Sequence, residues 1–370
     1  MTRSTGISGL LLGAAVIALP LAPARADAFV DQAKAFIAKV TAPVTTWSGP
    51  TTGPRAAKNK LVVYVSTDQR NGGARGVGNG VVQAAKAIGW RFRVLDGQGT
   101  ISGQTTAMGQ AIALKPDAII LGGVDALQEA PAVAQAEKLG IKVVGWHSGP
   151  TAGPMKNPQV FANITTDPLQ VAKAAALYVV ATSDGKAGVV IFTDSAYKIA
   201  IAKSDAMART VGECKSCKVL VTEDTPLADV AGRMPQLSTT LLQRYGKTWT
   251  YSLGINDLYF DFIAPALQAA GIQGGGPPIN ISAGDGSSSA FERIRTGQYQ
   301  AGTVAEPLNL QGWECIDELN RAFHGQPWSG YVPPVHLFTV ANIKSDGGPH
   351  NIYDPSNHYR EIYTKIWTGK

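Results

Sequence analysis

The sequence has few cysteines and histidines, and it lacks the common signatures of enzymes. Its five histidines show no zinc-ligand spacing, and no Gly-x-Ser-x-Gly motif for a nucleophilic serine is present. The stretch GGARGVGNG has the wrong glycine spacing for a dinucleotide-binding fingerprint, and DGKAG lacks the hydroxyl residue and the earlier glycine of a phosphate loop. We therefore expect no catalysis, no cofactor and no metal site.

Lysine and arginine form no clusters, and a long apolar run occurs only at the N-terminus. The stretch MTRSTGISGLLLGAAVIALPLAPARADA has a positive start, an apolar centre and small residues near its end, which is the pattern of a secretory signal peptide. Removing residues 1–26 takes away two arginines and no acid, which lowers the formal net charge from +6 to +4. We expect an exported, periplasmic monomer with a mildly basic, solvated surface and no nucleic-acid partner.

Three cysteines remain in the exported chain. Cys214 and Cys217 lie close together in GECKSCKVL, and in an oxidising compartment we expect them to form a local disulfide. Cys315 follows Trp313 at helical spacing, so we expect it to be a buried structural thiol.

After the signal peptide, residues 27–58 predict an amphipathic helix and then a connector rich in proline, glycine and threonine. Strands and helices then alternate, which is typical of a parallel sheet covered by helices. The same rhythm occurs twice, so we expect an α/β protein with two similar lobes that face each other across a cleft. The predicted strands are 61–66, 91–96, 117–123, 142–147, 188–194, 217–222, 249–257 and 279–285, and the helices are 76–88, 103–114, 127–138, 168–183, 198–211, 228–244 and 258–270.

Polar and aromatic side chains follow the predicted strands, at the edge where open parallel sheets bind ligands. They are Asp68, Gln69, Arg70, Asn71, Asp96, Gln98, Trp146, His147, Asp194, Asn256, Asp257 and Asp285. Helix capping is an alternative explanation for each single Asp or Asn. Trp146 and His147 cap helices poorly. An indole at the cleft would offer a face to a sugar ring or an aromatic ligand, and burial in the core is the alternative for Trp146.

Three stretches of the chain resemble a known family. LDGQGTISGQTTAMGQAIALKPDAIILGGVDA, AEKLGIKVVGWHS and the later INISAGDGSSSAFERIRTGQYQAGTVAEPLNLQGWECIDELNRAFHGQ are similar to the periplasmic sugar-binding proteins of ABC importers, the type I group that includes ribose-binding protein. The resemblance covers roughly residues 60–342. It implies two Rossmann-like lobes with parallel sheets joined by a three-segment hinge, the type I periplasmic binding protein fold.

The same resemblance implies where the lobes divide. Hinge crossings are expected near residues 163–167, 306 and 335, so each lobe is discontinuous in sequence. Lobe 1 would comprise residues 59–164 and 307–335, and lobe 2 would comprise residues 165–306 and 336–370 with the C-terminal tail.

Individual ligand-binding residues are also implied by the resemblance. Asn256 in GINDLYF matches an asparagine that hydrogen-bonds the ligand, and Asp285 in SAGDG matches an aspartate that accepts hydrogen bonds from sugar hydroxyls. Lys203 stands where ribose-binding protein has an arginine, and Glu306 stands where it has a hinge glutamine.

Other positions depart from the family pattern. His147 and Ser148 replace an Asp-Arg pair that grips the sugar in ribose-binding protein, and the first loop, STDQRNGGARG, lacks the aromatic residues found there. Asp285 and Glu306 suit the hydroxyls of a sugar or polyol, but with Trp146 they also suit a cationic amine. The sequence therefore leaves a non-sugar ligand, an amine or an aromatic molecule, as an alternative.

Taken together, these observations predict an exported solute receptor of an ABC importer that is not an enzyme. It would capture a small polar ligand, above all a sugar or polyol, between its lobes and deliver it to the membrane permease. A LacI-type regulator shares this core but needs a helix-turn-helix where this chain has a signal peptide. A periplasmic sensor that passes its ligand to a membrane receptor needs the same fold and pocket, so it remains an alternative.

Overall fold

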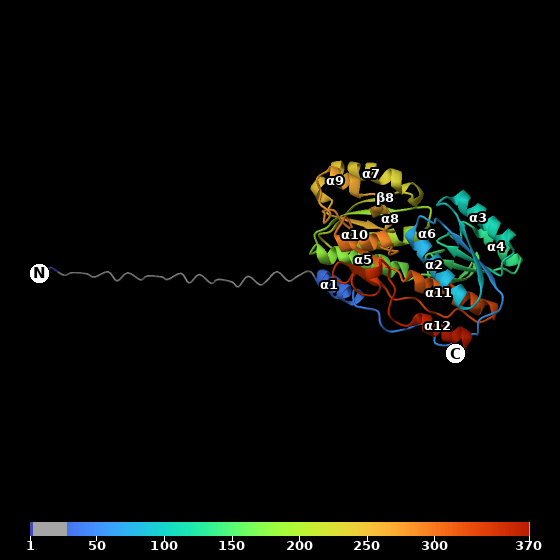
Figure 1. The fold of residues 1–370 in the computed structure, drawn as a ribbon. Coiled ribbons are helices and arrows are strands. Elements are labelled where there is room, and N and C mark those ends of the chain that lie inside the picture. The colour runs from blue at the N-terminus through green and yellow to red at the C-terminus, as the bar shows by residue number, and fades with distance from the viewer. Residues whose placement is uncertain (3–27, 370) are drawn as a thin grey trace.

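The computed structural model describes residues 1–2 and 28–369, and the predicted signal peptide therefore lies almost entirely outside the described residues. Two α/β lobes lie side by side (Figure 1), and each contains a six-stranded sheet. The predicted two-lobed α/β fold is confirmed. Within the described ranges, no helix combines the length and apolar character needed to cross a membrane.

The sheet of lobe 1 has the strand order β2-β1-β3-β4-β6-β5, and all its pairs are parallel except β5 with β6. Its strands are β1 (Leu61–Ser66), β2 (Arg91–Asp96), β3 (Ala118–Gly122), β4 (Lys142–Trp146), β5 (Gly153–Lys156) and β6 (Gln159–Ile164). Its helices are α2 (Gly72–Ala87), α3 (Ile101–Ala113), α4 (Ala130–Lys138) and α11 (Leu308–Phe323).

Alternating side chains along the strands of lobe 1 build two separate cores. In β1, Val62 and Tyr64 join the cluster that contains residues of α2 and α11, whereas Val63 and Val65 join the cluster on the opposite face with residues of α3 and α4. Successive side chains of a strand point to opposite faces, and here both faces are covered by helices. This covering explains why the predicted strand reads as one continuous apolar run.

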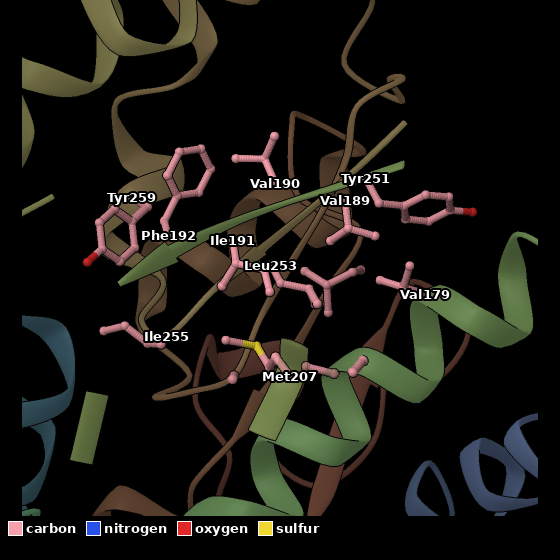
Figure 2. Packing of buried hydrophobic residues seen from close by; sticks show 14 of the residues in the cluster. Val179, Val189, Val190, Ile191, Phe192, Met207, Tyr251, Leu253, Ile255 and Tyr259 are labelled. Carbon is pink, nitrogen blue, oxygen red and sulfur yellow. The ribbon is translucent and has the colours of Figure 1, made fainter. Parts of the chain in front are cut away.

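The sheet of lobe 2 has the order β12-β11-β10-β9-β7-β8, and only β12 runs antiparallel to its neighbour. Its strands are β7 (Gly188–Thr193), β8 (Lys218–Asp224), β9 (Tyr251–Gly254), β10 (Ile279–Ser282), β11 (Gly302–Ala305) and β12 (His336–Thr339). Its helices are α5 (Pro168–Thr182), α6 (Lys198–Gly212), α7 (Val230–Tyr245), α8 (Leu258–Asp261), α9 (Ala264–Ala269) and α10 (Ser288–Thr296), with short 3-10 turns η1 (Leu227–Asp229) and η2 (Gly246–Thr248). Figure 2 shows its core, where Ile191 of β7 lies near Met207 of α6 and Val189 lies near Val179 of α5.

The chain crosses between the lobes in the middle of the sequence and again near both ends. After β6 it enters α5 of lobe 2, after β11 it returns to α11 of lobe 1, and after α11 it goes back to β12. Helix α1 (Ala28–Val40) packs against α5 of lobe 2, and the connector after it leads to β1 of lobe 1.

The C-terminal tail differs from the predicted division, which grouped residues 336–370 with lobe 2. A 3-10 turn, η3 (Gly348–His350), precedes helix α12 (Tyr359–Thr368), whose residues Tyr359, Tyr363 and Trp367 belong to the core of lobe 1. Figure 1 shows α12 beside α11, on the far side of the molecule from most of lobe 2. The reason is that three aromatic side chains on one face of α12 need an apolar partner, and α11 offers one.

Several predicted elements differ in their limits, and for two of them the local reason is clear. Helix α2 begins at Gly72 rather than near residue 76, because the Asn71 side chain accepts hydrogen bonds from the Gly73 and Ala74 amides and caps the helix there. The predicted helix over 258–270 is divided into α8 and α9, with Pro265 at the start of α9, where it cannot donate a backbone hydrogen bond. Strand β9 also ends earlier than expected, at Gly254.

The sequence predicted one local disulfide and one buried thiol. The structure joins Cys214 to Cys217 by a disulfide, just after helix α6. Cys315 is a buried free thiol in helix α11.

Candidate functional site

A pocket of about 640 Å³, counted with its open mouth, lies between the two lobes at the carboxyl ends of their strands. Its charged and amide-bearing lining residues are Asp68, Asn71, His147, Lys203, Asn256 and Asp285. Its apolar lining comes from Trp146, Ile199, Ala200, Leu227, Ala228, Ile255 and Leu258. The pocket therefore combines apolar walls with a small set of polar groups from both lobes.

Direct hydrogen bonds hold the lobes together across this pocket. The Tyr197 hydroxyl of lobe 2 lies 3.1 Å from Thr67 Oγ1 and accepts a 3.2 Å hydrogen bond from Gln104 Nε2, both in lobe 1. The Lys198 amide donates to Asp125 Oδ2 across the same gap, at 3.1 Å. The structure thus has the lobes in contact, as in a closed form.

Trp146 and His147 extend from the end of β4 into the region between the lobes. Their rings stack with centroids 3.9 Å apart, and Trp146 Nε1 donates a 2.8 Å hydrogen bond to Gln311 of α11. Trp146 is only 2% exposed and belongs to the core of lobe 1, although it also lines the pocket. His147 has a φ of 52°, a left-handed conformation that non-glycine residues rarely adopt and that turns the chain sharply after the strand.

Glu306 lies at the hinge crossing directly after β11 and is fully buried. One of its carboxylate oxygens, Oε2, accepts hydrogen bonds from the Thr166 amide (3.0 Å) and from Gln311 Nε2 (2.6 Å). The other, Oε1, lies 2.8 Å from His147 Nε2 and 3.9 Å from Lys203 Nζ. Glu306 therefore contacts groups from lobe 1, lobe 2 and a second hinge segment, but it lies beneath the pocket and does not line it.

Asp285 follows β10 and carries the most direct polar link to the pocket. Asn256 Nδ2 donates a 2.7 Å hydrogen bond to Asp285 Oδ2, and His147 Nδ1 lies 3.8 Å from Asp285 Oδ1. Lys203 Nζ donates to the Ala283 carbonyl at 2.9 Å. One oxygen of Asp285 is therefore occupied by Asn256, and the other faces the lobe 1 imidazole.

The pKa values of the two buried carboxyl groups, Asp285 and Glu306, are shifted in opposite directions. Burial raises the pKa of Asp285, and the charges of His147 and Lys203 offset this only in part. Burial would also raise the pKa of Glu306, but the charges of His147 and Lys203 and the bond from Gln311 outweigh it and lower that pKa to about 2. Glu306 is consequently a permanent anion at neutral pH.

The structure places four predicted ligand residues outside the pocket lining, namely Glu306, described above, and Gln69, Arg70 and Asp194. The Arg70 guanidinium donates back to both oxygens of Asp68, and Gln69 is partly exposed, with its backbone amide bonded to Asp96. Asp194 accepts hydrogen bonds from the Ala196 and Leu227 amides, so its carboxylate holds the loops after β7 and β8 and does not cap helix α6.

Asp257, which the sequence also singled out, likewise holds backbone amides of a neighbouring loop and does not cap its own helix. Its Oδ2 atom accepts hydrogen bonds from the amides of Gly286 and Ser287, and its Oδ1 atom accepts one from Gln300. Burial raises its pKa, and these bonds offset that effect in part. Asp257 thereby fixes the loop that carries Asp285.

Sequence reasoning missed Tyr197 and most of the apolar wall. Tyr197 lies between β7 and α6, four residues after the strand end, so a slightly wider window after each strand would have included it. Ile199, Leu227 and Leu258 gave no signal, because single apolar residues near helix starts are common in any α/β protein.

One nitrogen of His147 and one oxygen of each of Asp285 and Glu306 lie within 4.8 Å of one another, and all three residues are buried. These three residue types are ones that can ligate a divalent ion, although their spacing in the sequence gave no reason to expect a metal site. The wider pocket offers acceptors and donors along one side and apolar surface along the other. Such an arrangement can bind a small molecule that carries hydroxyl groups.

Comparisons with known proteins agree with this geometry. The sequence profile of the family described as "Periplasmic binding protein domain" matches residues 62–327. No curated protein matches the chain.

Solved structures with the same fold share little sequence with the chain. A galactofuranose binding protein is 16% identical, with a TM-score of 0.67, and the match covers 82% of this chain and 99% of that one. A sugar ABC transporter protein from Yersinia enterocolitica is 16% identical, with a TM-score of 0.70 and coverage of 86% and 99%. A carbohydrate transporter solute binding protein from Agrobacterium radiobacter, in complex with D-arabinose, is 18% identical, with a TM-score of 0.68 and coverage of 80% and 100%.

Proposed function

The chain belongs to the periplasmic binding protein domain family, and from this premise we propose that it is the solute receptor of an ABC importer for a small sugar or polyol. The family consists of binding proteins, so the chain is a binding protein and not an enzyme. The names of the similar structures, which include a galactofuranose binding protein and a D-arabinose complex, support a sugar as the ligand.

The observation that carries the proposal is the convergence of polar groups from both lobes on one pocket. His147 comes from lobe 1, and Lys203, Asn256 and Asp285 come from lobe 2. Carboxylate and amide groups pair well with hydroxyls, and a charge-assisted hydrogen bond contributes roughly 1.5 to 3 kcal/mol. A ligand bonded to both sides would therefore stabilise the closed arrangement over an open one.

The charges around the pocket favour a neutral ligand over a cationic one. Asp285 and Glu306 supply two carboxylates, but the Lys203 ammonium lies 3.9 Å from Glu306 and the His147 imidazole lies between the two acids. The protein already provides a partner for the negative charge, so an amine ligand would compete with Lys203. A sugar or polyol needs no such exchange.

In this account the protein works outside the cytoplasm and acts through a membrane partner. The N-terminal sequence supports export, and the family description supports a periplasmic location. The closed, ligand-bound form would dock on the permease as a monomer and release the sugar there. Binding and delivery need only the two lobes and the hinge, without chemistry on the ligand.

The proposal is tested by calorimetric titration of the purified, ligand-free protein with pentoses, hexoses and polyols. We expect Asp285→Ala to weaken binding of the best sugar at least about tenfold, since about 1.4 kcal/mol is lost with one hydroxyl left unpaired. Gln69→Ala is the matched control, because Gln69 is partly exposed and lies outside the pocket lining, and it should change affinity less than twofold. Equal affinities for both variants would show that the ligand binds elsewhere.

A further inference from the structure

We propose that the ligand is a deoxy sugar of the 6-deoxyhexose class, in which a methyl group replaces the terminal hydroxymethyl group, and that an aliphatic wall of lobe 2 around Leu227 selects this methyl group. The inference rests on the proposed function and deepens it. Its basis is the unequal chemistry of the two sides of the pocket. Lobe 2 lines the pocket with six aliphatic residues, namely Ile199, Ala200, Leu227, Ala228, Ile255 and Leu258.

This aliphatic wall is assembled at the carboxyl ends of three neighbouring strands. The strand order places β9, β7 and β8 side by side, and the wall residues lie in the segments that follow them. Leu227 belongs to η1, after β8, and Leu258 opens α8, after β9. Both leucines pack against the core of lobe 2 yet are only partly buried, so each keeps apolar surface that faces the pocket. The wall is therefore supported from behind and available to a ligand in front.

The aromatic surface of the pocket is less available than this aliphatic wall. In the described lining of lobe 1, Trp146 is the one large apolar side chain, and it is only 2% exposed. The His147 ring covers it, with ring centroids 3.9 Å apart and planes 10° from parallel. A flat indole suits the face of a sugar ring, but this one is already stacked on an imidazole. Apolar contact with a ligand consequently falls on lobe 2.

Much of the polar capacity of the lining is already used within the protein. Asn256 Oδ1 accepts a hydrogen bond from the Leu258 amide, and Asn256 Nδ2 donates to Asp285. Lys203 Nζ donates to the Ala283 carbonyl. The pocket thus offers few remaining polar partners beside a broad apolar surface. A sugar with a hydroxyl on every carbon would bury at least one hydroxyl against aliphatic side chains.

A 6-deoxyhexose matches both parts of this lining. Its ring hydroxyls can bond to the remaining polar groups, such as Asp285 Oδ1, while its methyl group contacts the leucines. Burying a methyl group is favourable, whereas burying a hydroxyl that loses its water partners and gains none is costly. An apolar subsite that accepts a methyl group discriminates against the hydroxylated analogue by about tenfold or more.

The test is a calorimetric titration of the purified, ligand-free protein with pairs of sugars that differ by a single hydroxyl. The pairs are L-fucose with L-galactose, L-rhamnose with L-mannose, and D-fucose with D-galactose. We expect at least one deoxy sugar to bind about fivefold or more tightly than its parent hexose.

Leu227→Asn tests the residue assigned to the methyl group. It has a similar volume, adds a polar group to the wall and keeps the backbone amide that bonds to Asp194. We expect it to bring the affinities for the two sugars of the preferred pair within about twofold of each other. Leu237→Asn is the matched control, because Leu237 is also partly buried against the lobe 2 core but lies outside the pocket lining. It should keep the wild-type ratio, and a loss of stability in either variant acts equally on both sugars.

The inference is overturned if no pair reaches this ratio, or if Leu227→Asn retains the ratio of the wild type. Binding of a parent hexose, another sugar or a polyol under those conditions leaves the importer proposal standing by itself. Binding of no sugar or polyol at all removes both proposals.

Discussion

Trp146 serves the core of lobe 1 and the wall of the pocket at once. It packs among the buried residues near α11, donates its indole hydrogen to Gln311, and presents one side to the cleft beside His147. The two interpretations of this residue, ligand platform and core, are therefore not exclusive. Because Trp146 is buried, we expect its substitution to affect the stability of the fold more than the affinity for ligand.

We predict that Trp146→Ala lowers the free energy of unfolding of the ligand-free protein by about 3 to 5 kcal/mol, the usual cost of truncating a buried tryptophan. Trp146→Phe keeps most of the packing and leaves Gln311 Oε1 without its donor, so it should cost about 1 to 3 kcal/mol. Urea unfolding of the three proteins measures both values. A Trp146→Ala variant within about 1 kcal/mol of wild type would contradict the packing described here.

Glu318 is a second residue whose environment has a measurable consequence. Burial raises its pKa to about 7, although the Ser329 amide donates to its carboxylate. The folded protein therefore keeps a proton on Glu318 up to about pH 7, whereas the unfolded chain loses it near 4.5. Because the folded state holds more protons between these values, this residue makes stability fall as pH rises from about 4.5 to 7.

We predict that Glu318→Gln has the stability of wild type near pH 5 and exceeds it at pH 8 by at most about 3 kcal/mol. The glutamine carbonyl can still accept the bond from Ser329, so the comparison isolates the charge. Unfolding midpoints at pH 5, 6.5 and 8 measure the difference. The same pH dependence in both proteins would show that Glu318 ionises normally.

At the residue scale, the sequence predicted the pocket only in part. Open parallel sheets bind ligands beyond the carboxyl ends of their strands, and this rule identified Asp68, His147 and Asn256. It works because parallel strands of one sheet end at the same edge. It could not separate Asp194 from a ligand residue, because a carboxylate that holds backbone amides and one that binds a hydroxyl have the same chemistry. Only the positions of the Ala196 and Leu227 amides decide between them.

At the element scale, the closest packing lies between helices α2 and α11. Gly80 of α2 and Gly312 of α11 face each other so closely that a Cβ on Gly312 would lie 2.5 Å from the backbone of Gly80. Through this close contact, α11, which follows the hinge, packs against α2, the first helix of lobe 1. The backbone contact leaves no space for a side chain at either position.

Gly312→Ala should therefore destabilise the protein by about 1 to 3 kcal/mol, since the helices must move apart. Gly109→Ala on α3 is the matched control, because nothing lies within 4 Å of the added methyl group. An alanine in an exposed helix should stabilise by about 0.5 to 1 kcal/mol. Thermal unfolding of both variants gives opposite shifts, and a loss of stability in both would mean that the α2–α11 contact is not special.

The order of strands and helices was predictable because apolar periodicity survives in the sequence, but their limits were not. The start of α2 depends on the Asn71 cap, and the break between α8 and α9 depends on Pro265. Each is a local effect of one residue that a periodic pattern averages out.

At the scale of the whole molecule, the two lobes are joined by more than the hinge. Tyr197 bonds to Thr67 and Gln104 across the cleft, and Glu306 links the hinge segments to His147. Helix α12 adds a further tie, because the C-terminal tail leaves lobe 2 and packs on lobe 1. The sequence showed that the tail carries aromatic residues, but not on which lobe they pack, since both offer apolar helix surfaces.

In the proposed function, the two lobes close on a polyhydroxy ligand. This closure is tested most directly by a thermal-shift screen of the purified protein, freed of carried-over ligand by unfolding and refolding, against sugars, polyols, amines and small aromatic molecules. A ligand at 100 times its dissociation constant adds about 2.7 kcal/mol of stability, which raises the melting temperature by several degrees. We predict that a sugar or polyol gives this shift. A shift with amines or aromatic molecules alone would contradict the account.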